Sequence, residues 1–128
     1  MKRDLGLIRE LLLKLEPISG PHAWRLIGPS DPEVQVEGHA PDEIEYHLQM
    51  LVEQGFVERP RSGAMQGIMF KKLTWGGHDY LDAVRDPKVW HKTKDATDKV
   101  GSWTFEIVKE LAKAVIKGEL QKIGIPLT

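Results

Sequence analysis

Apolar residues recur at helical spacing in several stretches of the chain. In residues 41–54, Ile44, Leu48 and Leu51 fall on one face at positions i, i+4 and i+7. Gly55 follows, where a left-handed residue commonly ends a helix, and two β-forming residues come next. The pattern predicts a helix over 41–54 that leads directly into a strand.

Two further helices are predicted from their stripes and their caps. Residues 3–16 carry a leucine-rich stripe behind an aspartate that can serve as N-cap. Asp86 followed by Pro87 is a preferred helix opening, and the apolar spacing extends this helix over 87–99.

The last predicted helix, over 103–122, has apolar residues around more than half of its circumference. An arc this wide needs two packing partners, and the rest of the chain supplies one of them. A second copy of the chain is the expected other partner, so we predict a homodimer. The predicted interface consists of Trp103, Phe105, Val108, Ala112 and Ile116.

Two hairpins are predicted between the helices. Residues 23–27 and 34–37 are β-forming runs separated by turn residues, and 56–59 is expected to pair with 67–73. The second hairpin concentrates four cations, Arg59, Arg61, Lys71 and Lys72. Two interpretations stay open: a charged edge that prevents aggregation, or contact with DNA phosphates in or beside the minor groove.

Thr74 is placed to cap another helix. Gly76 and Gly77 in its first turn lower helix propensity, which indicates that another backbone packs closely there. His47 and His78 lie on apolar faces and are expected as hydrogen-bonded core histidines.

Composition narrows the class of protein. The chain has 128 residues, no cysteine and a net charge of −1. Residues 1–84 carry nine Lys/Arg against thirteen Asp/Glu, and residues 85–128 carry nine against six. Nothing at the start resembles a signal peptide, and no apolar run approaches the roughly 18–20 residues of a membrane span. We expect a cytoplasmic protein that does not bind membranes.

Catalytic and metal-binding patterns are not found in the sequence. It has no nucleophile-elbow serine, no phosphate-cradling glycine loop and no histidine pair at metal-ligand spacing. His22 and His39 lie in predicted loops and are expected to be solvated. We therefore expect no enzyme, no catalytic residue, no metal and no cofactor.

Two runs carry a resemblance to known proteins. EIEYHLQMLVEQGFVE resembles the recognition helix and first wing strand of winged-helix regulators, and FKKLTWGGHDYLDAVRD resembles the end of the wing and the next helix. With MKRDLGLIRELLLKLE and WHKTK, the chain is similar to a small uncharacterised family of bacteria and their phages, a domain of unknown function.

The resemblance implies an α+β, mostly helical fold. It would consist of a winged helix-turn-helix core with a two-stranded wing over 1–86 and two additional helices over 87–128, in the same compact unit. In DNA-reading relatives the outer side of the second helix enters the major groove. The corresponding residues here include Gln49, which can read adenine, and Tyr46, which can contact a phosphate.

Two functions follow from the resemblance. The first is a DNA-binding transcriptional regulator of phage or prophage type that contacts double-stranded DNA through Tyr46, Gln49, Arg59, Arg61, Lys71 and Lys72. Asp42, Glu43 and Glu45 oppose it, because carboxylates at the start of the helix would face phosphates. The alternative is a protein-interaction module, an adaptor or modulator of a host protein that keeps the fold without binding DNA.

Overall fold

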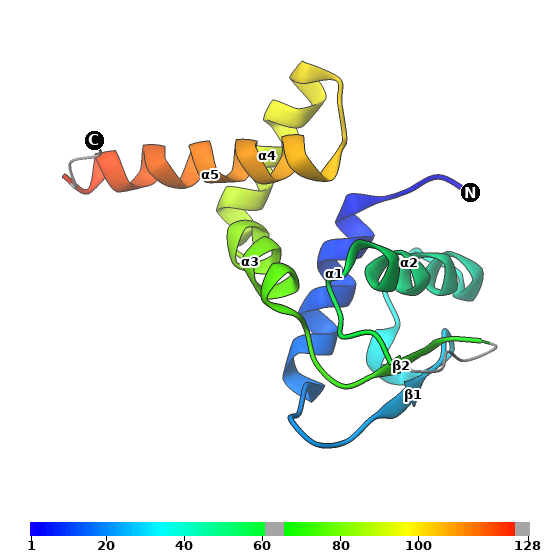
Figure 1. The fold of residues 1–128 in the computed structure, drawn as a ribbon. Helices are drawn as coiled ribbons and strands as arrows, with labels where there is room; N and C mark the ends of the chain where they lie inside the picture. The colour runs from blue at the N-terminus through cyan, green and yellow to red at the C-terminus, as the bar shows by residue number, and fades with distance from the viewer. Residues whose placement is uncertain (61–65, 125–128) are drawn as a thin grey trace. The chain divides into compact units, whose positions relative to one another are not determined.

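A computed structural model describes residues 1–60 and 66–124 of the chain (Figure 1). It divides into two units, Met1–Asp79 (unit 1) and Tyr80–Thr128 (unit 2). The elements are α1 Leu5–Leu15, η1 Glu16–Ile18, β1 Arg25–Ile27, η2 Pro32–Val34, α2 Pro41–Gln54, β2 Ile68–Phe70, α3 Trp75–Val84, α4 Pro87–Val100 and α5 Phe105–Lys122, where η denotes a short 3-10 helix. The expected α+β, mostly helical class is confirmed.

The first two α-helices of unit 1 have the ends that the sequence predicts. The Asp4 side chain caps α1 by accepting from the backbone N–H groups of Gly6 and Leu7. The α2 helix ends at Gly55, which has a φ of 79°. Ile44 and its apolar neighbours on α2 are buried, and α1 packs against α2.

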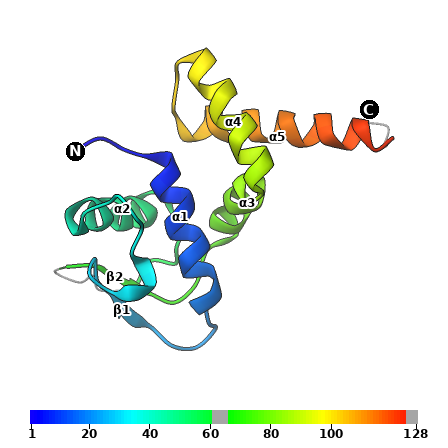
Figure 2. The same cartoon turned by 180° about the vertical axis from the view of Figure 1, so that it is seen from behind.

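The strands pair differently from the prediction. The segment expected to pair with 23–27 starts at Val34, the last residue of η2, and forms no strand. Gln35 donates its side-chain amide to the backbone oxygens of Pro29 and Asp31. These bonds close a compact loop, so the predicted 23–27/34–37 hairpin is wrong. Instead β1 pairs with β2 in an antiparallel ribbon. Figures 1 and 2 show this ribbon below α2, with β1 as the strand farther from the helix.

The second predicted hairpin is shorter than expected. Its described residues form one bridge, between Val57 and Leu73. Two hydrogen bonds flank it, from the Glu58 N–H to the Lys72 oxygen and from the Thr74 N–H to the Phe56 oxygen. All three residues of β2 pair with β1, and the bridge to the 56–59 segment lies beyond the end of β2. Residues 61–65 of the expected wing tip, including the predicted DNA contact Arg61, lie outside the described residues.

The start of α3 matches the prediction, whereas one predicted histidine position does not. The Thr74 hydroxyl accepts from the Gly77 N–H. A Cβ atom at Gly77 would lie 2.1 Å from the backbone oxygen of Phe56, so a second backbone does pack there. His47 is fully buried as expected, but His78 is exposed, and its Nδ1 lies 3.7 Å from a carboxylate oxygen of Glu16.

Unit 2 contains two successive helices, α4 and α5, that cross each other (Figures 1 and 2). Asp86 caps α4 with its carboxylate, and α4 packs against α5. The indole rings of Trp90 and Trp103 meet edge to face, with centroids 6.4 Å apart. The Lys92 ammonium of α4 donates to Glu119 of α5 at 2.6 Å. None of the described helices is long and apolar enough to cross a membrane.

Candidate interaction surface

The outer side of α2 is partly used to hold the ribbon. Both carboxylate oxygens of Glu45 accept from the backbone N–H of Gly67, at 2.9 and 2.8 Å. The Gln49 amide donates to the Gly67 oxygen at 2.7 Å and to Glu45 at 3.1 Å. Both polar groups of the Gly67 backbone are thus bound by α2, and the Gln49 amide is already occupied.

Gly67 itself is held in a conformation that requires glycine. Its φ is 74°, and a Cβ atom there would lie 2.2 Å from the backbone oxygen of Ile27. The residue before β2 is therefore locked between α2 and the end of β1. Its bonds to Glu45 and Gln49 hold the residue that precedes β2 against α2.

The α2 surface also carries several acidic side chains and an exposed tyrosine. Glu43 accepts from the Ala40 N–H, and its carboxylate lies 3.1 Å from Nδ1 of His39. These two bonds, that of His39 first, lower the pKa of Glu43 below 4.5. Tyr46 is exposed, and α2 contains four carboxylates but no lysine or arginine. Such a surface repels DNA phosphates.

The predicted cations lie on and beside the ribbon. Lys71 has its ammonium 5.5 Å from the ring centroid of Trp24. The Lys72 ammonium lies 3.9 Å from a carboxylate oxygen of Glu58. Arg59 is exposed and lines a shallow hollow together with Met69. In the described part of the chain, neither Arg59 nor Lys71 forms an ion pair.

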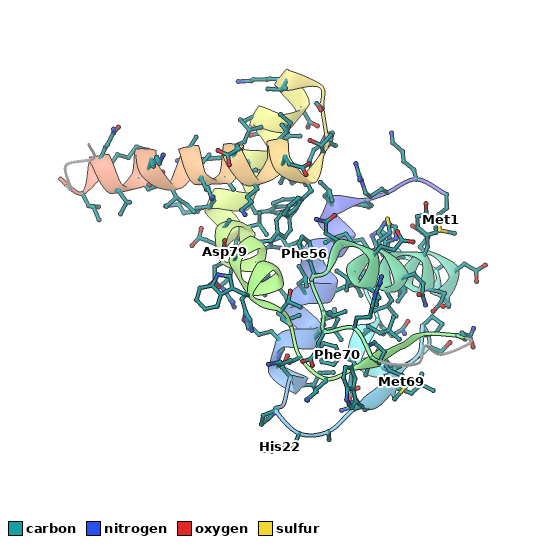
Figure 3. All side chains as sticks on the ribbon, viewed as in Figure 1. Met1, His22, Phe56, Met69, Phe70 and Asp79 are labelled. Atoms are coloured by element: carbon teal, nitrogen blue, oxygen red, sulfur yellow. The ribbon has the colours of Figure 1, made fainter. Side chains whose placement is uncertain are left out.

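A surface that the sequence did not predict lies on the outer side of the ribbon. It consists of Trp24, Leu26, Met69 and Lys71, and we call it the ribbon face. Leu26 and Met69 are directly opposite each other across the two strands. Leu26 is 56% exposed and Trp24 is 37% exposed. Figure 3 labels Met69 on the ribbon and Phe56 among the helices.

The alternation in residues 23–27 contained a signal for this surface. Trp24 and Leu26 fall on one side of a strand and Ile27 on the other. Ile27 is fully buried, so the side that carries Leu26 must face outward. The predicted pairing of 23–27 with 34–37 hides this signal, because it gives the strand the wrong partner.

The predicted dimer residues of unit 2 are largely used inside the chain. Val108 and Ala112 are fully buried. The Phe105 ring packs against Tyr80 with centroids 4.9 Å apart, and Trp103 packs against Trp90. Ile116 lines a hollow beside α4. The half-buried apolar residues that remain on α5 form a different stripe, Ile107, Leu111 and Val115.

The described residues offer no metal site, and the buried histidine among them has a structural role. They contain no group of three His, Cys, Asp or Glu side chains that could hold a metal ion. His47 accepts at Nε2 from the Asp4 N–H, 2.9 Å away, and its Nδ1 lies 2.7 Å from the Glu43 oxygen. Both ring nitrogens thus have partners within unit 1, which makes this histidine structural.

Comparison with known proteins places the chain in an uncharacterised group. Residues 2–103 match the model of a family described as "Hypothetical protein (DUF2513)". An uncharacterized protein of Haemophilus influenzae is 29% identical over 119 residues, which cover 91% of this chain and 96% of the relative. No solved structure matches the chain. The predicted membership of a family of unknown function is confirmed: the chain belongs to the DUF2513 family of hypothetical proteins.

Proposed function

We propose that the chain is a protein-binding module whose unit 1 is a winged helix-turn-helix core. The order of elements in unit 1 supports this core. A first helix, a strand and a short helix precede α2, which is followed by two extended segments joined by the Val57–Leu73 bridge. In this arrangement α2 occupies the place of the recognition helix.

The observation that carries the proposal is the use of Gln49 and Glu45 to hold Gly67. It removes from α2 the amide best suited to read a base. What remains outward is Tyr46 among carboxylates, with Met50 half-buried beside it. Aromatic and methionine side chains are enriched in protein interfaces, whereas carboxylates oppose phosphate contact.

Binding of double-stranded DNA is the second candidate function. It is favoured by the exposure of Arg59 and Lys72, two of the four cations of the predicted wing. Such a contact would depend on phosphates and would therefore weaken steeply with added salt. The regulator of phage or prophage type predicted from the sequence belongs to this candidate.

Two measurements separate the candidates. The tagged full chain is incubated with bacterial lysate, with and without nuclease treatment; retained proteins are quantified by mass spectrometry and retained nucleic acid by absorbance. A stoichiometric protein partner that survives nuclease treatment supports the proposal, and recovery of nucleic acid alone contradicts it. In parallel, fluorescence anisotropy with random duplex DNA is measured at two salt concentrations.

The DNA measurement has its own variant. The double variant Arg59→Glu/Lys72→Glu reverses two exposed charges without touching the buried core. If DNA binding is the function, the wild type binds at low salt and this variant loses binding. If the protein-binding proposal is right, neither form binds duplex DNA at physiological salt.

A further inference from the structure

We propose that the ribbon face is the docking site for an extended, acidic segment of a partner protein, which adds as a strand to the free edge of β1. The inference rests on the proposed protein-binding function and names its site and the chemistry of its partner. It differs from the surface of α2, which carried the functional proposal.

The first support is the exposed apolar surface. Leu26 is more than half exposed although it lies in the middle of a strand, and Met69 lies directly across from it. Trp24 extends the same side of the strand by two positions. Apolar side chains on neighbouring strands provide pockets for alternate side chains of an added strand.

The second support is the open strand edge. In the described residues the sheet contains β1 and β2 alone, and β2 is the strand that contacts α2. The outer edge of β1 therefore has no strand partner among these residues, in agreement with its outlying place in Figures 1 and 2. The free N–H and C=O groups of an edge strand are a template for another chain.

Charge identifies the partner as acidic. Arg25 of β1 is already paired with Glu33, whereas the Lys71 ammonium lies over the Trp24 ring. Lys71 thus adds a positive charge to the apolar surface and forms no ion pair among the described residues. A peptide that alternates apolar residues with Asp or Glu would match both features.

A nucleic acid fits the same surface less well. Stacking of successive bases requires several aromatic faces, and Trp24 is the aromatic residue of the ribbon face. The four carboxylates of α2 belong to the same unit and would repel a polyanion. A peptide with one or two carboxylates between apolar side chains avoids most of this repulsion.

The test is a selection of displayed random peptides, about ten residues long to match the usual upper length of a strand. The immobilised full chain is the target, and selected peptides are then synthesised with a fluorescent label for anisotropy titration. Leu26→Lys and Lys71→Glu alter the ribbon face. Trp75→Ala is the matched control, because Trp75 is an exposed aromatic residue on α3.

The expected result is enrichment of peptides that alternate apolar and acidic residues. Leu26→Lys and Lys71→Glu should each weaken their binding about tenfold or more, whereas Trp75→Ala leaves it unchanged. A proline at the centre of the peptide should also weaken binding, because it removes a ladder donor. Absence of enrichment, selection of basic peptides, or equal binding by Leu26→Lys would overturn the proposal.

Two additional arms separate this inference from the function on which it rests. If Leu26→Lys retains the same lysate protein as the wild type, the protein-binding function stands and the ribbon face is wrong as its site. If no lysate protein is retained by the wild type, the function itself fails. Binding of single-stranded DNA that depends on Trp24 and Lys71 would assign the surface to nucleic acid and overturn the peptide.

Discussion

Glu45 binds the backbone N–H of Gly67 with both of its carboxylate oxygens. This contact connects the middle of α2 to the residue that precedes β2, 22 positions later in the sequence. The Glu45 carboxylate, which from the sequence alone argued against DNA binding, therefore stabilises the fold of unit 1. The same contact also reassigns Gln49, which is bound to the other polar group of the Gly67 backbone.

Glu45→Ala should destabilise unit 1. The variant leaves the Gly67 N–H without its acceptor in a buried position, which costs about 1–3 kcal/mol of unfolding free energy. Urea denaturation followed by circular dichroism measures the change. The matched control is Glu53→Ala, since Glu53 is an exposed carboxylate on the same helix. Equal stability of the two variants would show that the Glu45 contact does not hold the ribbon.

Gly77→Ala and Gly76→Ala should have opposite effects. A Cβ atom at Gly77 meets the Phe56 oxygen at 2.1 Å, whereas at Gly76 the nearest atom is Thr74 Oγ1 at 3.8 Å. We expect Gly77→Ala to cost about 2–4 kcal/mol, and Gly76→Ala to be neutral or to stabilise by up to about 1 kcal/mol. Thermal unfolding of both variants tests the pair. A tolerated Gly77→Ala would contradict the close backbone approach.

His47→Leu should be strongly destabilising and His78→Leu nearly neutral. His47 is fully buried and accepts from the Asp4 N–H, so leucine removes an acceptor from the start of α1. The expected cost is about 2–4 kcal/mol, against about 0.5 kcal/mol or less for the exposed His78. Denaturant midpoints of the two variants measure this difference. Comparable losses would mean that His78 has a role that its exposure does not indicate.

The pair Lys92 and Glu119 should make stability depend on pH. The bond from Lys92, followed by that from Lys122, lowers the pKa of Glu119 below 4.5, and the bond to Glu119 raises the pKa of Lys92 above 10.5. A carboxyl whose pKa is lower in the folded state stabilises that state above its unfolded pKa. This stabilisation disappears as the pH falls through the folded pKa. The lysine contribution is present below 10.5 and is lost as the pH rises through its raised folded pKa.

The corresponding measurement is urea unfolding of Glu119→Gln across acid and alkaline pH. This variant should lose less stability than the wild type on acidification, because it lacks the titrating partner. Glu110→Gln, which changes an exposed carboxylate on the same helix, should follow the wild type. Identical acid curves for all three proteins would exclude a contribution from the Lys92–Glu119 pair.

The predicted homodimer should depend on the stripe Ile107, Leu111 and Val115. These residues are half-buried, whereas Val108 and Ala112 of the interface predicted from the sequence are fully buried. Leu111→Glu should convert a dimer to a monomer, because it places a charge in an apolar contact. Light scattering after size exclusion measures the mass, with Lys113→Glu as the exposed control. A wild-type monomer at high concentration would contradict the homodimer.

Local signals determined the ends of the helices before any contact was known. Asp4 and Asp86 cap α1 and α4, and Gly55 ends α2 with positive φ. These are interactions between residues a few positions apart, so the sequence specifies them directly. The close approach of the Phe56 backbone to Gly77 was also predictable. Glycine in the first turn of a helix lowers its stability, so its presence there indicates a close backbone contact.

Strand pairing and side-chain partners were decided by the tertiary structure. A three-residue strand such as β1 contains too little pattern to select between neighbouring partners, and the 3-10 turn at Pro32 removed the one that was predicted. Whether Glu45 and Gln49 of α2 are free to face solvent likewise depended on the position of the Gly67 backbone, which binds both. The sequence by itself therefore determined the helices and the family, because caps and periodicity act locally. The ribbon, the roles of Glu45 and Gln49 and the exposed Leu26 came from the tertiary structure, because non-local contacts are what choose between equivalent local patterns.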